Sequence, residues 1–433
     1  MGLLNILKKI EPDKKNSPFL HTLYDGFFTF AYAPNTVTKE GVHVRDGMDL
    51  KRTMVMVVLA MQLCYVFGTY NIGHQHFVAA GQYLGFLEGF HLKLAHGLIK
   101  LLPIFVFTHV VGLGIEFWFA AKKGHPIEEG FLVSGALIPL IMPPDIPIWI
   151  LCVAVAFAVI LGKEAFGGTG MNIWNVALLA RVFVFFAYPT TISGDEVWVS
   201  GYDGLAAGTV ADYGWAHGML DSLFGWMDLP VFGSGAAVVD GYSGATPLAL
   251  AYQGGWENVT AHFSQAQLWW GTIPGSIGET SKPLILIGAG ILLATGIASW
   301  RIMLSMLIGA AVMGMLLNAW DATPFMGVPW MYQFYLGSFF FAMAFMATDP
   351  VTAASTATGK WVYGFLIGMI GMLIRVINPA YPEGWMLAIL FLNTFAPLID
   401  HYVIEANMKR RHKASAKGVS SHSVSQQNEV THA

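Results

Sequence analysis

Charged side chains are scarce in this sequence. Asp, Glu, Lys and Arg together make up 12% of the 433 residues, about half the share found in soluble globular proteins. Hydrophobic residues make up 55%, and the mean hydropathy is +0.56. This composition excludes an ordinary soluble domain and predicts an all-α protein that crosses a membrane several times. We expect membrane lipid around it and no nucleic-acid partner.

Cysteine is nearly absent as well. Cys64 and Cys152 lie far apart in apolar segments, so the sequence holds neither a disulfide framework nor a CxxC metal site. We therefore expect no iron–sulfur cluster in this chain. A secretory signal pattern is lacking, because the first long apolar run begins only at Met54. The glycine-rich fingerprint of a nucleotide-binding fold is lacking too, so we do not expect the chain to oxidise NADH alone.

Ten hydrophobic runs follow the polar N-terminal segment. Most are long enough to cross a hydrocarbon core of about 30 Å, which takes ~20 helical residues. The third and fourth runs are short and meet at Pro-Pro-Asp-Ile-Pro, residues 143–147, which forces irregular backbone. The ten runs cover residues 54–70, 97–120, 131–142, 146–162, 173–188, 283–299, 302–319, 331–348, 361–378 and 385–404.

Lysine and arginine are unevenly distributed, and this predicts the orientation of the chain. Residues 1–53 are basic, whereas residues 189–282 hold nine carboxylates against the single Lys282. Ten crossings then place both termini in the cytoplasm, and we expect the bacterial inner membrane as the location. The predicted organisation is a cytoplasmic basic segment (1–53), five spans (54–188), an outer segment (189–282), five more spans (283–408) and a disordered cytoplasmic tail (409–433).

Each set of five spans contains a break at its third member. Pro-Pro-Asp at residues 143–145 interrupts the first set on the outer side, and Thr-Asp-Pro at residues 348–350 ends the eighth run on the inner side. An odd number of crossings inverts the second set relative to the first. The pattern is therefore typical of two inverted five-helix repeats with broken helices, and a solute transporter or channel is one functional alternative.

One motif has a chemistry of its own, the run Asp-Gly-Tyr-Ser-Gly-Ala-Thr at residues 240–246, which Pro247 follows. The run predicts a turn that brings Thr246 to the N-cap of a helix, with Pro247 as its first residue and an end near Tyr252. On local chemistry alone, an ordinary capped surface helix is the simpler interpretation. The alternative is a phosphate near Thr246, bound by N–H groups and the positive end of the helix.

Several further stretches, taken with residues 240–246, resemble known proteins. They are HVRDGMDLKR (43–52), KEAFGGTGMN (163–172), FFAYPTTISGD (185–195), IPGSIGE (273–279), GIASWRI (296–302), FMATDP (345–350), INPAYPEG (377–384) and FAPLIDH (395–401). Through them the chain resembles, over nearly its whole length, the NqrB/RnfD family, and above all its NqrB members from the sodium-translocating NADH:quinone oxidoreductase (Na+-NQR). The related RnfD of the Rnf complex, which would exchange electrons between ferredoxin and NAD, is the nearest alternative. The basic N-terminal extension and residues 43–52 favour the quinone-linked complex.

The resemblance implies a covalent flavin. In the family, the last threonine of the attachment motif is esterified to the phosphate of FMN. Here that residue is Thr246, and Ser243, Gly244 and Ala245 precede it. A flavin on this motif argues against the transporter or channel.

The resemblance implies a second flavin, a non-covalent riboflavin, at Asn172 and Asn175. These residues follow the glycines of the 167–170 stretch, between the fourth and fifth runs. Two amides three residues apart suit the polar edge of an isoalloxazine ring, whereas close helix packing is the alternative explanation of the glycines. Family members commonly have arginine and proline where this chain has Met171 and Val176.

A candidate quinone site lies on the second run. Gly112 and Glu116 are four residues apart, so they place a gap and a carboxylate on one helix face. A solvated acid at a helix end is the alternative. The resemblance implies that the two residues border the ubiquinone site, although Leu113 replaces a glycine often found beside the first.

Ionisable residues within or beside the runs are functional candidates, because their desolvation is unfavourable. They are Arg181, Asp349, Arg375 and Asp400. Phe341, Phe345 and Asp349 share one helix face at a spacing of four, although packing and helix capping are sufficient reasons for them. The resemblance implies that these three residues, with Asp400, form the sodium path.

Taken together, the resemblance implies one subunit of a six-subunit respiratory sodium pump, an NADH:ubiquinone reductase of the translocase class. Electrons from NADH, oxidised in a partner subunit, would pass through FMN and riboflavin to ubiquinone. Sodium would be moved outward in the same process. The protein would supply binding and electrostatics, and the flavins the redox chemistry.

Overall fold

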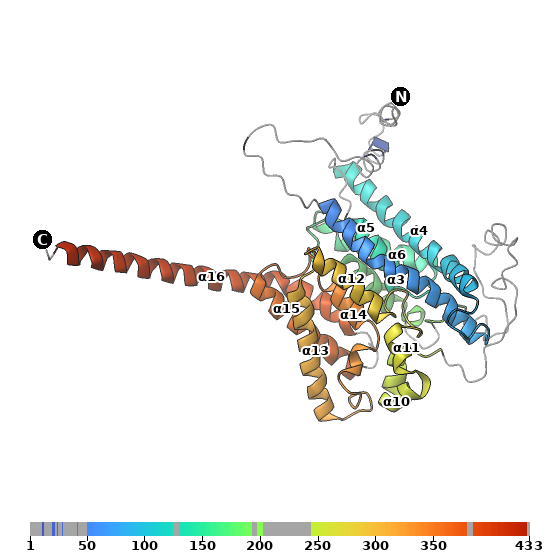
Figure 1. Ribbon diagram of the computed structural model, residues 1–433. Helices are drawn as coiled ribbons and strands as arrows, with labels where there is room; N and C mark the ends of the chain where they lie inside the picture. Colours follow the sequence, from blue (N-terminus) through green and yellow to red (C-terminus); the bar gives the residue numbers. More distant parts are fainter. Residues whose placement is uncertain are drawn as a thin grey trace.

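The computed structural model describes residues 50–123, 130–192, 197–201, 244–378 and 384–430, and a few isolated positions before residue 50. This part of the chain is helical and contains no strand, which confirms the all-helical prediction for it (Figure 1). The principal helices are α3 (Leu50–Ala79), α4 (Phe90–Lys123), α5 (Phe131–Ile141), α6 (Ile148–Gly162), α7 (Val176–Ala187), α10 (Pro247–His262), α11 (Gln265–Trp270), α12 (Lys282–Ala294), α13 (Trp300–Trp320), α14 (Phe339–Phe341), η6 (Ala342–Met346), α15 (Ala357–Ile377) and α16 (Gly384–Val430).

Each of the ten hydrophobic runs contains a helix, but several of these helices are short. Six are long and apolar enough to cross a membrane, namely α3, α4, α6 with the turn after it, α13, α15 and the first part of α16. α5, α7 and α12 have 11, 12 and 13 residues. At 1.5 Å per residue they reach about 20 Å or less, short of a core of about 30 Å. Membrane insertion therefore has six candidate spans, and ten crossings stay a prediction.

The break predicted at residues 143–147 separates α5 from α6. α5 ends at Ile141, because Met142 is extended and two prolines follow it. α6 begins directly after Pro147. Most residues of α5 are buried, so this broken segment lies inside the helix bundle.

The helix of the eighth run is not a regular α-helix. α14 continues directly as the π-helical turn η6, and the N–H of Ala347 donates to the carbonyl of Ala342 at 2.8 Å. Single π turns are rare and are frequently found at functional sites. After this turn the backbone stays irregular until Thr356 caps α15. The break predicted at residues 348–350 is therefore longer than the proline alone requires.

Glycines let neighbouring helices approach closely. A Cβ on Gly97 of α4 would overlap the carbonyl of Thr69 in α3, and a Cβ on Gly288 of α12 would lie 2.6 Å from the carbonyl oxygen of Ala60 in α3. Small residues at such crossings are typical of membrane helices. Because α3 packs against both α4 and α12, it joins the first half of the chain to the second (Figure 1).

The tail departs from its prediction. α16 continues to Val430 as one helix that extends away from the bundle (Figure 1), whereas the sequence predicts disorder from residue 409. Low hydrophobicity was the reason for that prediction, and it reports on the lack of a buried face. Helix formation also depends on the absence of breakers, and residues 409–430 contain no proline.

Candidate functional site

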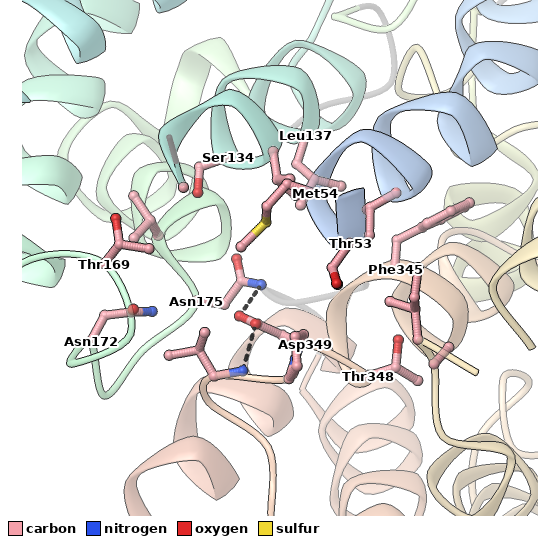
Figure 2. A pocket seen from close by; sticks show the side chains of 18 of the residues that line it. Thr53, Met54, Ser134, Leu137, Thr169, Asn172, Asn175, Phe345, Thr348 and Asp349 are labelled. Atoms are coloured by element: carbon pink, nitrogen blue, oxygen red, sulfur yellow. Dashed lines mark hydrogen bonds between the residues drawn. The ribbon is translucent and has the colours of Figure 1, made fainter. Parts of the chain in front are cut away.

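A cavity of about 70 Å³ lies where α3, α5 and α7 begin, beside the segment that follows η6 (Figure 2). Its lining brings together Asn172 and Asn175 with Phe345 and Asp349, residues that the sequence assigns to two separate sites. Other residues of the lining carry hydroxyl or amine groups: Thr53, Ser134, Lys163, Thr169 and Thr348. The candidate flavin and sodium residues thus share one space.

Asn175 connects the two sides of this cavity. Its side-chain oxygen caps α7, accepting hydrogen bonds from the N–H groups of Ala177 (3.0 Å) and Leu178 (3.2 Å). The amide NH2 is left to donate to Oδ2 of Asp349 at 3.3 Å (Figure 2). Only an amide has both an acceptor for the cap and a donor for the acid. One buried side chain therefore positions α7 and Asp349 together.

Neutral donors surround the carboxylate of Asp349. Oδ1 accepts from the N–H of Val351 at 3.0 Å, and Oδ2 accepts from the hydroxyl of Thr352 at 3.0 Å in addition to Asn175. Among the described residues, no lysine or arginine forms an ion pair with Asp349. The residue lies outside the six candidate spans, and burial raises the pKa of its carboxyl while these hydrogen bonds oppose the shift. A proton and a metal cation would therefore compete for the same oxygens.

Phe341 and Phe345 are neighbours, as the sequence predicts. Their ring centroids are 5.1 Å apart at an interplanar angle of 50°, and both side chains are buried. Phe345 lines the cavity, whereas Phe341 is not part of the lining. The π turn lies between these rings and Asp349, and it changes the helix register that the sequence assumes. Closure of an ion passage by the two rings stays a prediction.

Asp400 lies apart from the cavity lining and binds the start of α15. Its Oδ2 accepts from the N–H of Ser355 at 2.6 Å, and its Oδ1 accepts from the N–H of Thr356 at 3.0 Å. The irregular segment between η6 and α15 is therefore bound by an acid at each end, Asp349 and Asp400. The structure connects the two acids through this segment and does not place them in one pocket.

The candidate quinone residues lie on the side of α4 that packs against α5 and α6. A Cβ on Gly112 would overlap the ring of Phe131, so that ring fills the gap that the sequence predicts for a ligand. Glu116 forms an ion pair with Lys163, and both side chains are 5% exposed. Because Lys163 also lines the cavity, Glu116 is one ion pair away from it. Sequence reasoning missed Lys163, although it opens one of the matching stretches.

Thr246 is the N-cap of α10, as the sequence predicts. Its backbone is extended (φ −71°, ψ 153°), its hydroxyl accepts from the N–H of Ala249 at 3.2 Å, and Pro247 follows as the first helical residue. Gly244 has a φ of +65°, a conformation that favours glycine. Ser243 lies outside the described residues. α10 contributes nothing to the cavity, and it lies at the other end of the bundle from the start of α3 (Figure 1).

The cavity fits a small cation better than a whole flavin. Its 70 Å³ is about half the ~150 Å³ of a cavity that binds one benzene ring. The closed part therefore does not admit a three-ring isoalloxazine, and a flavin would have to meet Asn172 and Asn175 at the mouth. For a cation the donor set is suitable: the Asp349 carboxylate and the hydroxyls of Thr53 and Thr348, which face the cavity in Figure 2, are the oxygen ligands that hard cations prefer.

Sequence comparisons give the same picture along the whole chain. A family described as "NQR2, RnfD, RnfE family" matches residues 37–409. A protein of Chromohalobacter salexigens is 44% identical over 443 aligned residues, covering 96% of this chain and 97% of the relative. One from Pseudomonas aeruginosa is 42% identical over 436 residues, covering 95% and 99%, and one from Azotobacter vinelandii is 42% identical over 413 residues, covering 90% and 93%. All three carry the name Na(+)-translocating NADH-quinone reductase and the letter B among its subunits.

Proposed function

Since the chain belongs to the NQR2, RnfD and RnfE family, we propose that it is the NqrB membrane component of a respiratory sodium pump. In this role it carries electrons that originate from NADH toward ubiquinone, coupled to outward movement of sodium. The observation that carries the proposal is the match to a relative named for this reductase, at 44% identity over 96% of the chain. The other subunits of a six-subunit complex are the proposed partners, and the bacterial inner membrane is the proposed location.

The Rnf alternative predicts a different electron donor and acceptor, which gives the test. Membranes that contain the complex assembled with this chain are expected to reduce ubiquinone with NADH, at a rate that rises with sodium and not with an equal concentration of potassium. Membranes from a strain without the chain are expected to lose this sodium-stimulated rate. A complex that instead reduces NAD with ferredoxin, and leaves quinone untouched, would place the chain with RnfD.

We propose ten crossings in two inverted repeats, and the packing of the helices supports this arrangement. The second and fourth helices of each set pack together, α4 with α6 and α13 with α15. The fourth also packs with the fifth, α6 with α7 and α15 with α16. In both sets the third member is short and is followed by a proline-containing break. Such breaks at equivalent positions are typical of inverted-repeat membrane proteins.

The proposed attachment point for FMN is the hydroxyl of Thr246. Bound there, FMN would supply one- and two-electron chemistry that no side chain offers. The chain contributes a half-buried hydroxyl at a helix start, in a backbone conformation fixed by Pro247 and by the cap to Ala249. A fixed N-cap gives the ester oxygen one direction, which a flexible loop would not.

Asn172 and Asn175 are the proposed contacts of a non-covalent riboflavin, and Asp349 is the proposed acceptor of sodium from the cytoplasm. What supports the pairing is their common cavity and the hydrogen bond from Asn175 to Asp349. An occupant that draws the Asn175 amide toward itself takes a donor away from the acid. The two sites are therefore coupled through one side chain, and by linkage each would alter the affinity of the other.

Gly112 and Glu116 are the proposed border of the quinone site, and the ring of Phe131 is the group that a quinone would have to displace. Gly112→Val is expected to raise the KM for ubiquinone about tenfold, equivalent to ~1.4 kcal/mol, because the new side chain overlaps that ring. Steady-state kinetics with short-chain ubiquinone provide the measurement. NADH is expected to reduce the flavins of the variant complex normally.

A control lies on the same helix. Gly114 has nothing within 4 Å of its Cβ position, so Gly114→Val adds the same volume without the overlap and is expected to leave KM unchanged. Adding Phe131→Ala to Gly112→Val is expected to restore quinone binding. If flavin reduction and quinone reduction fail together in Gly112→Val, the residue is structural and the quinone site lies elsewhere.

A further inference from the structure

The outer end of the bundle buries more positive than negative charge. Arg181, Lys282 and Arg375 are 2%, 1% and 0% exposed, and Glu279, at 8%, is the acid whose charge acts on the last two. Glu279 is already paired with Arg181 at 3.1 Å. Among the described residues this group, which we call the outer cationic cluster, therefore carries two positive charges in excess. A buried charge without a counter-charge is strongly unfavourable.

The cluster also contains hydrogen-bond donors that no described residue uses. Arg375 donates through Nη1 to the carbonyl of Gln333 at 2.8 Å, but its Nε and Nη2 have no partner in the described part of the chain. The hydroxyls of Thr280 and Ser281, which begin α12 beside Lys282, are buried and equally without a partner there. Unused donors beside excess positive charge require an acceptor that is an anion.

The first turn of α10 lies next to this cluster. A Cβ placed on Gly337 would be 3.0 Å from Nη2 of Arg375 and 3.5 Å from Cδ2 of Leu248. Leu248 is the second residue of α10, and Thr246 is the N-cap of the same helix. Gly337 has a φ of +61° and no side chain, so only a glycine leaves the guanidinium and α10 this close.

We propose that the outer cationic cluster binds a phosphate group, with Arg375 as its principal ligand, and that this phosphate is the one that links FMN to Thr246. The inference rests on the proposed attachment and adds a binding residue to it. A phosphodiester carries one negative charge and has two free oxygens, which suit the paired donors of a guanidinium. The cluster would then hold the ester in place and offset part of its own excess charge. Free phosphate or a phospholipid headgroup has the same chemistry and is the alternative source.

The source can be identified by hydrogen exchange in the purified, assembled complex. In a Thr246→Ala complex, inorganic phosphate is expected to slow amide exchange in peptides that cover the end of α15, compared with chloride at equal ionic strength. The Thr246→Ala, Arg375→Met double variant is expected to show no slowing. In the wild-type complex phosphate is expected to change nothing, because the ester occupies the site. Slowing in the wild type would assign the site to another phosphate, and no slowing in Thr246→Ala would exclude a phosphate site.

A second measurement uses the mass of the isolated protein chain. Arg375→Met is expected to reduce the fraction that carries covalent flavin, and Arg375→Lys, which keeps the charge, to retain more of it. Arg301 also lies over a tryptophan ring, at 5.6 Å, on another helix, so Arg301→Met is the matched control and is expected to keep full flavin content. Full flavin content in Arg375→Met would refute the role of Arg375. A flavin still attached in Thr246→Ala would instead refute the attachment itself.

Discussion

Thr246→Ala is expected to remove the covalent flavin of this protein completely. A phosphoester needs a hydroxyl at a fixed position, and Thr246 offers one at the N-cap of α10 with Pro247 behind it. On a denaturing gel the wild-type band is expected to fluoresce under ultraviolet light and the variant band to be dark. Thr246→Ser retains a hydroxyl and is expected to keep some fluorescence. NADH-driven quinone reduction is expected to fall with flavin content.

Loss of the helix cap is a separate effect of this substitution, and Thr356 provides the control for it. Thr356 caps α15 in the same way, accepting from the N–H of Gly359 at 3.0 Å. Removal of such a cap costs about 1 kcal/mol of stability. Thr356→Ala is therefore expected to lower stability while the band stays fluorescent. A fluorescent band in Thr246→Ala, at normal protein level, would show that the flavin is attached elsewhere.

Asp349→Ala is expected to raise the sodium concentration for half-maximal quinone reduction by at least about tenfold, or ~1.4 kcal/mol. The carboxylate is the only charged oxygen ligand that the cavity lining offers among the described residues. Its donors are neutral, so a cation meets no competing positive side chain there. Activity measured against sodium at constant ionic strength gives the half-maximal concentration. Both flavins are expected to stay bound.

Two further substitutions separate charge from packing. Asp349→Asn keeps the size of the side chain and is expected to show nearly the full loss of sodium affinity. Asp321 is an exposed acid at the end of α13, and Asp321→Ala is expected to leave the sodium dependence unaltered. If Asp349→Ala assembles normally and responds to sodium as the wild type does, the ion does not use this acid.

The sequence was a good guide to local structure. A lipid environment forces the backbone into helices, because its polar groups find no water there, so each hydrophobic run predicts a helix. Thr246 and Pro247 form the predicted helix start because capping depends only on neighbouring residues. Residues 143–147 interrupt a helix for the equally local reason that proline lacks a donor. Helix length was less predictable, since tertiary packing stabilises helices too short to span the bilayer.

The candidate site was only partly predictable, because its contacts join distant parts of the chain. The amide of Asn175 meets a carboxylate 174 residues later, and no spacing rule indicates such a pair. The ring of Phe131 in the gap beside Gly112 is a result of how α5 packs on α4. Lys163 was missed for the same reason, since its partner Glu116 lies on another helix. Residue types predicted the chemistry, and the fold decided which residues share a cavity.

The irregular chain between η6 and α15 has two unlike ends. At Asp349 the carboxylate oxygens accept from neutral groups, so a bound cation can share or replace these bonds. At Asp400 the carboxylate accepts from the backbone of Ser355 and Thr356, and these bonds also cap a helix of 21 residues. The segment is therefore a lever with a fixed pivot at α15 and an exchangeable contact at the cavity. Ion occupancy at Asp349 would be converted into a rotation about residues 355–356, with its largest displacement at the π turn.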